Sequence, residues 1–179
     1  MIWAIDEPHE QAMEEVISGP DRVVAIVTAA LVEDRLDTLV KTRLRKRDEV
    51  VREMFRSNGP LGTFSTKIDL AFLIGIYSDR TRKDLHAIRK IRNEFAHELL
   101  TLDFEHGRVR DLATNLTIKD RFTVTLTSPD HKFKMQMGEP EDAERGLTVR
   151  EHFVVSCQLY LLVLRMLSNT KGSKLLGEI

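Results

Sequence analysis

Cys157 is the single cysteine in the sequence, and this scarcity excludes two ways of stabilising a fold. One thiol cannot form an intrachain disulfide, and it cannot supply a cysteine-rich metal cluster. Because Cys157 lies within an apolar helical pattern, we expect a small buried residue rather than a catalytic nucleophile. The spacing of the His, Asp and Glu residues fits no metal-binding motif either. We therefore expect no metal and no other cofactor.

Long hydrophobic runs are also missing. The longest apolar stretch, residues 153–167, is interrupted by Gln158 and Arg165. It is shorter than the ~20 apolar residues that a membrane-spanning helix needs. Residues 1–8 include two acidic side chains and lack the basic and apolar segments of a secretory signal. Both absences favour a cytoplasmic protein with no membrane segment.

An excess of charge of either sign is absent as well. The 27 Lys and Arg residues nearly balance the 28 Asp and Glu residues, so the formal net charge is -1. Such a protein has no overall field that attracts nucleic acid, and any contact of that kind needs a local basic patch. One candidate is the basic run at residues 41–47. We interpret it mainly as a solvated helix end, and its alternative role is contact with phosphate.

The length and composition indicate one globular domain. The 179 residues are 42% hydrophobic and 31% charged, which is enough apolar material for a core without disulfides. We find no internal repeat and no low-complexity linker, so residues 1–179 are expected to form a single domain. Apolar residues recur with helical spacing over most of the chain. The expected helices are residues 7–17, 22–44, 50–57, 63–75, 79–100, 109–116 and 148–168.

The period of the pattern changes over residues 121–137. Apolar residues alternate with threonines up to Leu126, and they alternate with lysines and glutamine from Phe133 onward. Pro129 and Asp130 supply turn chemistry between the two segments, which together predict a β-hairpin. We expect it to lie on the helical body, because an isolated hairpin is only marginally stable in water. The expected fold class is therefore mainly α, a helical bundle with a β-hairpin insertion at about 121–137.

Residues 84–99 carry the most informative pattern. On an ideal helix, Ile88, Ile91 and Phe95 lie in one narrow arc and predict the face that packs on the core. Arg92 falls at the edge of that arc. A charge so near a core needs a partner, because burying it unpaired is costly. The acidic candidates are Glu33, Asp34 and Asp69.

The opposite face of the same helix is polar. His86, Asn93 and His97 lie within about 40° of one another, and Arg82 and Arg89 flank them. A histidine changes protonation near neutral pH, and fixed cations stabilise the negative charge of a phosphoryl transition state. Such a set can cleave RNA without a metal, by general acid–base catalysis. On spacing alone, a solvated polar face is the more common explanation.

Catalysis by this face needs a second copy of it. One exposed helix face forms no cleft that excludes water, whereas two copies that meet across a dimer axis can form one. The nuclease hypothesis therefore predicts a homodimer in which His97 lies near its symmetry mate.

The segment RNEFAH, residues 92–97, resembles the R-polar-x-x-x-H motif of the HEPN superfamily. Members of that superfamily are helical domains that typically dimerise, and many are metal-independent ribonucleases of toxin–antitoxin and antiviral systems. The resemblance implies that Arg92 positions the scissile phosphate, that Asn93 hydrogen-bonds it or orients the histidine, and that His97 is the general acid or base. The residues expected to contact RNA beside them are Arg82, His86 and Arg89.

A second set of residues resembles the mannitol-operon repressor family. It consists of the Asn58-Gly59-Pro60-Leu61-Gly62 turn, then Ser65, Lys67, Leu70 and the Ile74-Gly75 turn. The similarity covers about residues 25–100. Members of this family resemble HEPN domains and are described as transcriptional regulators without a recognised DNA-reading motif. The resemblance implies a helical repressor that works through a protein partner.

Two main functional hypotheses follow. The first is a HEPN-type endoribonuclease that acts on RNA as a homodimer, in a toxin or defence system. The alternative is a transcriptional regulator of the mannitol-repressor kind that acts through protein–protein contacts. A third hypothesis treats the helices on either side of residues 75–78 as a helix-turn-helix, with Arg80, Arg82 and Lys83 in the major groove. The second helix is long for that role, so we do not expect direct sequence-specific DNA binding.

Overall fold

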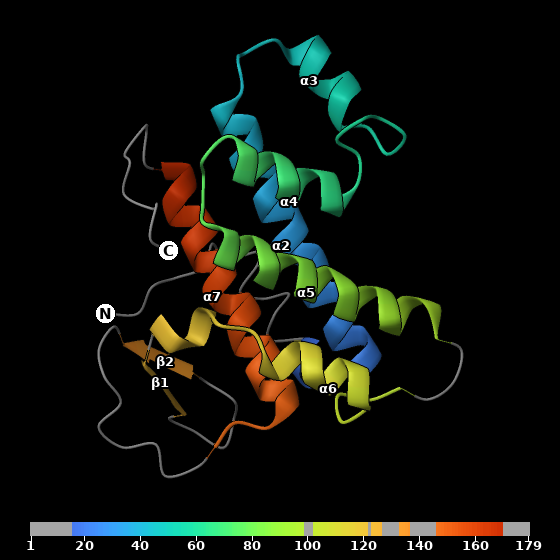
Figure 1. The fold of residues 1–179 in the computed structure, drawn as a ribbon, viewed down its shortest axis with the longest axis vertical. Coiled ribbons are helices and arrows are strands. Elements are labelled where there is room, and N and C mark those ends of the chain that lie inside the picture. The colour runs from blue at the N-terminus through green and yellow to red at the C-terminus, as the bar shows by residue number, and fades with distance from the viewer. Residues whose placement is uncertain (1–15, 99–101, 122, 127–132, 137–145, 170–179) are drawn as a thin grey trace.

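The computed structural model describes residues 16–98, 102–121, 123–126, 133–136 and 146–169. Within these residues the chain is mainly helical (Figure 1). The α-helices, in chain order, are α2 Asp21–Arg43, α3 Asp48–Phe55, α4 Phe64–Leu73, α5 Asp79–His97, α6 Gly107–Thr114 and α7 Val149–Asn169. The shorter elements are the 3-10 helix η1 Ile118–Arg121 and the strands β1 Thr123–Leu126 and β2 Phe133–Gln136.

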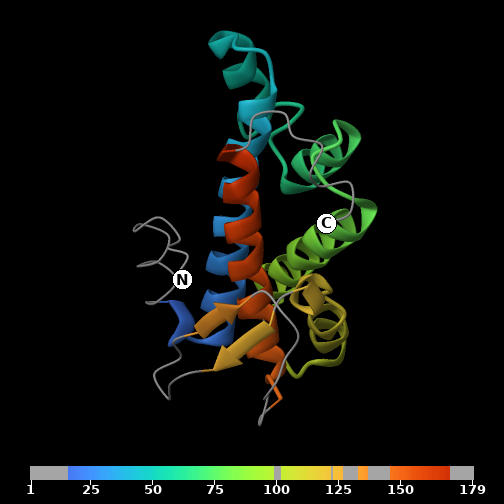
Figure 2. The ribbon, with the colours of Figure 1, turned by 90° about the vertical axis from the view of Figure 1, so that its left-hand side faces the viewer.

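Helices α2 and α7 run side by side in the same direction (Figure 2). At one end of the pair, Arg150 of α7 donates a hydrogen bond of 2.6 Å to the carboxylate of Asp21, the first residue of α2. At the other end, Arg43 of α2 donates to the carbonyl oxygen of Leu167 at 2.5 Å. Helix α7 is buried on nearly all sides in its middle, so this pair holds much of the core. Among the described helices, none combines the length and the hydrophobicity of a membrane span.

Helices α4 and α5 pack against α2, and local interactions fix the junction between them. Thr63 caps α4, because its hydroxyl oxygen accepts a hydrogen bond of 3.2 Å from the backbone N–H of Thr66. Gly75 follows α4 with a φ of +74°, a left-handed conformation that glycine adopts without strain. The hydroxyl of Tyr77 then donates to the carbonyl oxygen of Ile68 at 2.9 Å and ties the turn back to α4.

A row of three aromatic rings connects α5 to α7. The ring centres of Phe95 and Phe104 are 5.1 Å apart, and those of Phe104 and Phe153 are 5.2 Å apart. Both pairs are tilted, an arrangement that adds attraction beyond the burial of apolar area. The core face predicted for α5 is confirmed, because Ile88, Ile91 and Phe95 are fully buried.

A buried carboxylate, Asp84, links three parts of the chain. Asp84 lies on α5 and is only 4% exposed. Its Oδ2 accepts hydrogen bonds from the backbone N–H of Thr117 at 2.8 Å, from the hydroxyl of Thr117 at 2.9 Å and from the hydroxyl of Tyr160 at 2.8 Å. These donors offset part of the cost of removing the carboxylate from water. Helix α5, the segment after α6 and helix α7 are therefore joined through one oxygen atom.

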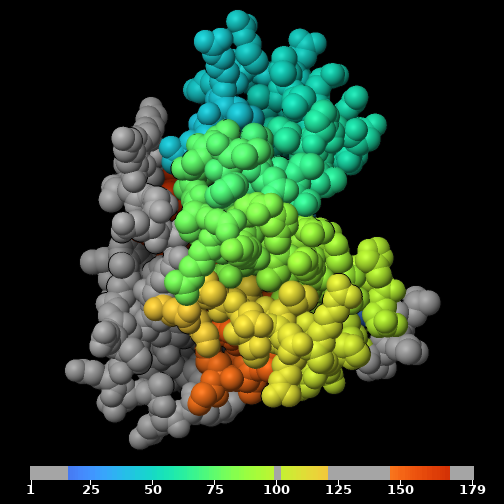
Figure 3. Space-filling model, viewed as in Figure 1, coloured from blue at the N-terminus to red at the C-terminus, as the bar shows by residue number. Residues whose placement is uncertain are grey.

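The last turn of α2, helix α3 and the loop to α4 form a protrusion, residues 41–62, which we call the α3 lobe. The lobe stands beyond the end of α7 in Figure 2 and above the atoms of α4 and α5 in Figure 3. No residue of α3 is buried. The loop returns tightly, because the N–H of Leu61 donates to the carbonyl of Met54 at 2.8 Å. A Cβ on Gly59 would lie 2.6 Å from that same carbonyl oxygen, and Gly62 is equally confined by carbonyls that follow α3.

The predicted helices correspond to observed ones, with ends shifted by a few residues. Helices α2, α3, α4, α5, α6 and α7 match the predictions at 22–44, 50–57, 63–75, 79–100, 109–116 and 148–168. The predicted helix at 7–17 lies almost wholly outside the described residues. The periodicity of apolar residues is therefore a reliable guide in this chain wherever a helix covers the core.

The mainly α class is right, but the predicted β-hairpin insertion needs a correction. The prediction placed one hairpin over residues 121–137 on the helical body. At its start, Arg121 instead ends the 3-10 helix η1, and hydrogen bonds from Thr117 to Asp84 hold the segment before η1 against α5. Strands β1 and β2 have four residues each and pair antiparallel, and the residues between them lie outside the described part of the chain.

The described core consists of residues from the helices and from the segments that connect them. The expectation of a β-hairpin insertion in a mainly α fold is therefore corrected to a helical fold, with two short paired strands outside the part whose burial is described. The physical reason is that alternation of apolar and polar side chains reports a local extended conformation. It does not report whether the extended segments reach a core.

We expect the stability of the protein to fall on mild acidification because of His152, which is 4% exposed in α7. Burial, and then the charge of Lys119, lower the pKa of His152 from 6.5 to about 4. The unfolded chain therefore binds a proton that the folded chain does not. The stabilisation is complete above pH 6.5 and is lost as the pH falls toward 4.

Urea denaturation of the wild type and of His152→Phe across this pH range tests the expectation. The unfolding free energy of the wild type should drop by about 3 kcal/mol relative to that of the variant. Other titrating groups are common to both proteins and cancel in the comparison. A difference between the two proteins that stays constant with pH would contradict the assignment.

We expect Asp84→Ala to lower the unfolding free energy by about 2–4 kcal/mol, because it leaves the donors of Thr117 and Tyr160 without their acceptor. Asp111→Ala is the matched control, since Asp111 is exposed on α6, and its effect should stay within about 0.5 kcal/mol. Chemical denaturation at neutral pH measures both. Equal losses in the two variants would show that Asp84 does not link the helices.

Candidate functional site

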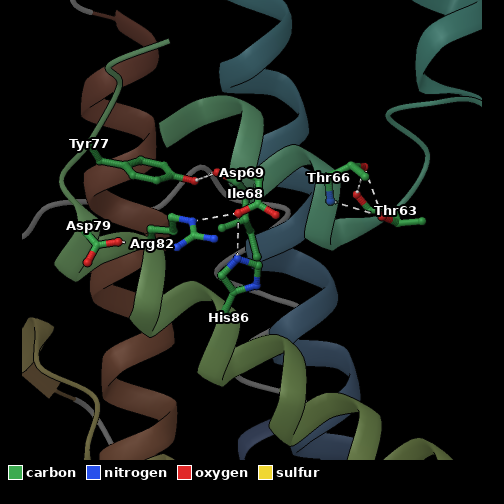
Figure 4. Close-up of polar contacts among 8 residues, drawn as sticks. All are labelled: Thr63, Thr66, Ile68, Asp69, Tyr77, Asp79, Arg82 and His86. Carbon is green, nitrogen blue, oxygen red and sulfur yellow. Dashed lines mark hydrogen bonds and ion pairs between the residues drawn. The ribbon is translucent and has the colours of Figure 1, made fainter. Parts of the chain in front are cut away.

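Four polar side chains gather where α4 meets the start of α5 (Figure 4). The Nε of Arg82 donates to Oδ1 of Asp69 at 2.8 Å, and its Nη1 lies 3.5 Å from Oδ1 of Asp79. The Nε2 of His86 lies 3.1 Å from the same oxygen of Asp69. The guanidinium of Arg82 also lies over the ring of Phe72, 5.5 Å from its centre. We call Asp69, Asp79, Arg82 and His86 the Asp69 cluster.

The charges of the Asp69 cluster stabilise one another. Burial acts to raise the pKa of Asp69, but the hydrogen bonds and charges of His86 and Arg82 together outweigh it, so this pKa lies below its usual value. The hydrogen bond with Asp69 in turn raises the pKa of Arg82. The side chains of Asp69 and Arg82 are 41% and 35% exposed, so solvent screens the pair and its contribution to stability is small. The positive charge of Arg82 is thus balanced within the molecule.

A second group of charges lies where α4 and α5 cross α2. Lys67 of α4 is 7% exposed, and its Nζ lies 3.2 Å from Glu33 and 3.1 Å from Asp37, both on α2. Arg92 of α5 lies 3.6 Å from the second carboxylate oxygen of Glu33. Asp37 also pairs with Lys41. We call these five residues the Glu33 cluster. Of the three acidic partners considered for Arg92, the structure places Glu33 beside it.

The remaining residues of the predicted nuclease set stand apart from both clusters. His97 is the last residue of α5 and is exposed, and Asn93 is half-buried. Within the described part of the chain, neither side chain has a hydrogen-bond partner. Arg89 is half-buried, and its Nε has no hydrogen-bond partner among the described residues. His86 precedes His97 by eleven residues, which is ~16 Å along a helix.

The structure therefore brings together only some of the predicted site residues. It joins Arg82 to His86 through Asp69, and it joins Arg92 to Glu33. His97 lies one helical turn from Asn93 on α5, but it has no hydrogen bond or ion pair with a described residue. Among the described residues, no group of His, Cys, Asp and Glu is arranged to hold a metal ion. The described geometry pairs opposite charges and ties α5 to its neighbours.

The sequence analysis did not predict that Lys67 and Asp84 are buried and join helices, although the position of each beside an apolar helix face indicates it. Lys67 directly precedes Ile68 and follows the buried Phe64 by three residues, so it lies beside the apolar face of α4. Asp84 precedes Ile88 by one helical turn and therefore extends the core face of α5. The partners of both residues come from distant parts of the sequence, and local spacing does not reveal them.

Comparisons with known proteins give the chain a context. A search among curated proteins finds no significant match. The chain is similar to a chain in the X-ray structure of the MtlR–HPr complex from Escherichia coli, with a TM-score of 0.60 and 20% sequence identity. The alignment covers 86% of this chain and 96% of that chain. At this identity the likeness shows a shared fold alone.

The sequence profile of the MtlR family, described as mannitol repressor, matches residues 10–168. Neither comparison names the HEPN superfamily, so that part of the resemblance stays a prediction. The matched range contains α2 to α6 completely and α7 up to its penultimate residue. A profile that spans nearly every described element establishes membership, and the chain therefore belongs to the mannitol repressor family.

Proposed function

We propose that this protein is a transcriptional regulator of the mannitol-repressor kind that acts by binding a protein partner, HPr or a protein like it. The observation that carries the proposal is the family match over residues 10–168, together with the fold shared with a chain of the MtlR–HPr complex. A repressor that works through a partner needs a stable helical scaffold and no catalytic cleft. The ion pairs along α5 fit that requirement.

The geometry of α5 supports a scaffold in two ways. Arg92, the residue predicted to hold a scissile phosphate, already faces the carboxylate of Glu33. Arg82 and His86, which were predicted to contact RNA, share the carboxylate of Asp69. An RNA phosphate at either place would have to displace a carboxylate or lie beside it, and like charges at short range repel. Both arrangements favour contacts within the protein.

The HEPN-type endoribonuclease stays a hypothesis, and we do not prefer it. Its catalytic residues would be Arg92, Asn93 and His97, and its homodimer would have to bring two copies of His97 together. Its RNA-contacting residues would be Arg82, His86 and Arg89. No family comparison supports a ribonuclease, a toxin–antitoxin role or a homodimer.

We expect the purified chain to bind HPr from the same host. Isothermal titration calorimetry at two temperatures should show one-to-one binding with a Kd of about 10 μM or tighter and a negative heat-capacity change, because a specific interface buries apolar surface. Ubiquitin, a small soluble protein without a role in this system, is the control titrant. An absence of heat at both temperatures, confirmed by a single unshifted peak in size-exclusion chromatography, would contradict the proposal.

We also expect no RNA cleavage that depends on His97. The wild type, His97→Ala and the matched control His106→Ala, whose histidine is exposed at the start of α6, are incubated with a mixed RNA substrate and chelator. The three proteins should give the same low background. Cleavage by the wild type and His106→Ala that disappears in His97→Ala would reject the scaffold role of α5 and revive the nuclease hypothesis.

A further inference from the structure

The α3 lobe carries a concentration of positive charge that the proposed function does not use. Residues 41–62 contain seven basic and three acidic side chains, a net charge of +4, in a chain whose formal net charge is -1. Within the lobe, helix α3 projects beyond the ends of the other helices, as Figures 1 and 2 show. A basic protrusion on a nearly neutral protein produces a local positive potential that reaches outward.

Five of these cations are available to a partner. The side chains of this set are exposed and form no hydrogen bond or ion pair within the described part of the chain: Arg45, Lys46, Arg47, Arg52 and Arg56. The contrast with α5 is direct, because Arg82 and Arg92 both face carboxylates there. An arginine that no acidic neighbour holds can give its full set of donors to an external anion.

The three acidic residues of the lobe, Asp48, Glu49 and Glu53, leave its net charge at +4. Asp48 and Glu49 stand in the first turn of α3, where they face the positive end of the helix dipole. Arg52 lies in the last turn of the same helix, and Arg56 follows one turn later. Arg56 is the C-cap residue of α3, so both arginines lie at the C-terminal end of this helix.

Apolar side chains of the lobe offer little to a protein partner. The largest, Phe55, is half-buried and is covered by the ammonium of Lys41, which lies 4.9 Å from the ring centre. Val50 is the large hydrophobic residue of the lobe that is exposed, at 59%. Protein interfaces depend on apolar and aromatic anchors at their centre, whereas contacts with a nucleic-acid backbone depend on arginine and lysine.

We propose that the α3 lobe binds the phosphate backbone of duplex DNA without reading its sequence, through these five cations. Arg47 and Arg56 flank α3, which is ~12 Å long, the axial rise of about three to four nucleotides of one strand. Four of the five cations are arginines, whose planar guanidinium can donate two hydrogen bonds to one phosphate. The proposal does not depend on HPr binding, because it concerns the chain alone.

The salt dependence of binding tests the proposal. The full chain is titrated against a fluorescent 30-base-pair duplex of random sequence between 50 and 200 mM NaCl. Five phosphate contacts predict a slope of log K against log salt of about −4.5, which is a loss of about 500-fold in affinity over this range. The variant Arg45→Gln/Lys46→Gln/Arg47→Gln should reduce the slope to about −2 and the loss to about 12-fold.

Matched controls separate the lobe from general charge. The variant Lys83→Gln/Lys90→Gln/Arg108→Gln removes the same charge from exposed positions on α5 and α6, and it should keep the wild-type slope. Circular dichroism checks that all variants fold. No duplex binding at 50 mM NaCl, or an equal slope change in the control, would overturn the proposal. Tighter, lobe-dependent binding to polyglutamate than to DNA would also overturn it and would assign the surface to an acidic protein.

Discussion

Helix α7 has no polar side in its middle, and the arrangement of the other helices follows from this constraint. Residues 152–157 and 159–164 are all buried, so a single neighbouring helix does not suffice to cover them. Helix α2 lies along α7 in the same direction, and α6 and η1 pack on another part of its surface. The carboxylate of Asp84 then bonds to Tyr160 of α7 and to Thr117 before η1. The position of α5 therefore depends on how its neighbours bury α7. The positions of the polar residues on α5 depend on it in turn.

Most of the helical framework can be predicted from the sequence because the signal is local. Apolar residues repeat with the period of a helix wherever one side faces the core, and Cys157 is buried as its position in such a pattern predicts. Burial also raises the pKa of its thiol, which agrees with a packing residue. The alternating pattern after residue 121 is equally local, but its relation to the core is a long-range property. That is why the hairpin was misjudged while the helices were not.

The polar residues of α5 show where local reasoning stops. Spacing on a helix correctly indicates that Arg92 needs a carboxylate and that His86 shares a side with other polar groups. It does not choose Glu33 over Asp34, because that choice depends on how α5 crosses α2. Helical spacing also does not reveal that the carboxylate of Asp69 is a shared hydrogen-bond partner of Arg82 and His86. Arginine and histidine can serve in catalysis, and they can equally join helices through ion pairs. The acidic partners that distinguish these two roles lie far away in the sequence.

The glycines of the α3 lobe have a consequence for how such a protein can diverge. Gly59 and Gly62 lie against backbone carbonyls, so any side chain there would force the loop apart. The exposed cations nearby are under no such restriction, because their side chains form no hydrogen bond or ion pair within the described residues. Descendants of this chain are thus free to gain, lose or reverse the charge of the protrusion by single substitutions. The shape of the lobe and its connection to α4 would not change with those substitutions. The surface charge of the lobe can therefore vary while its backbone stays the same.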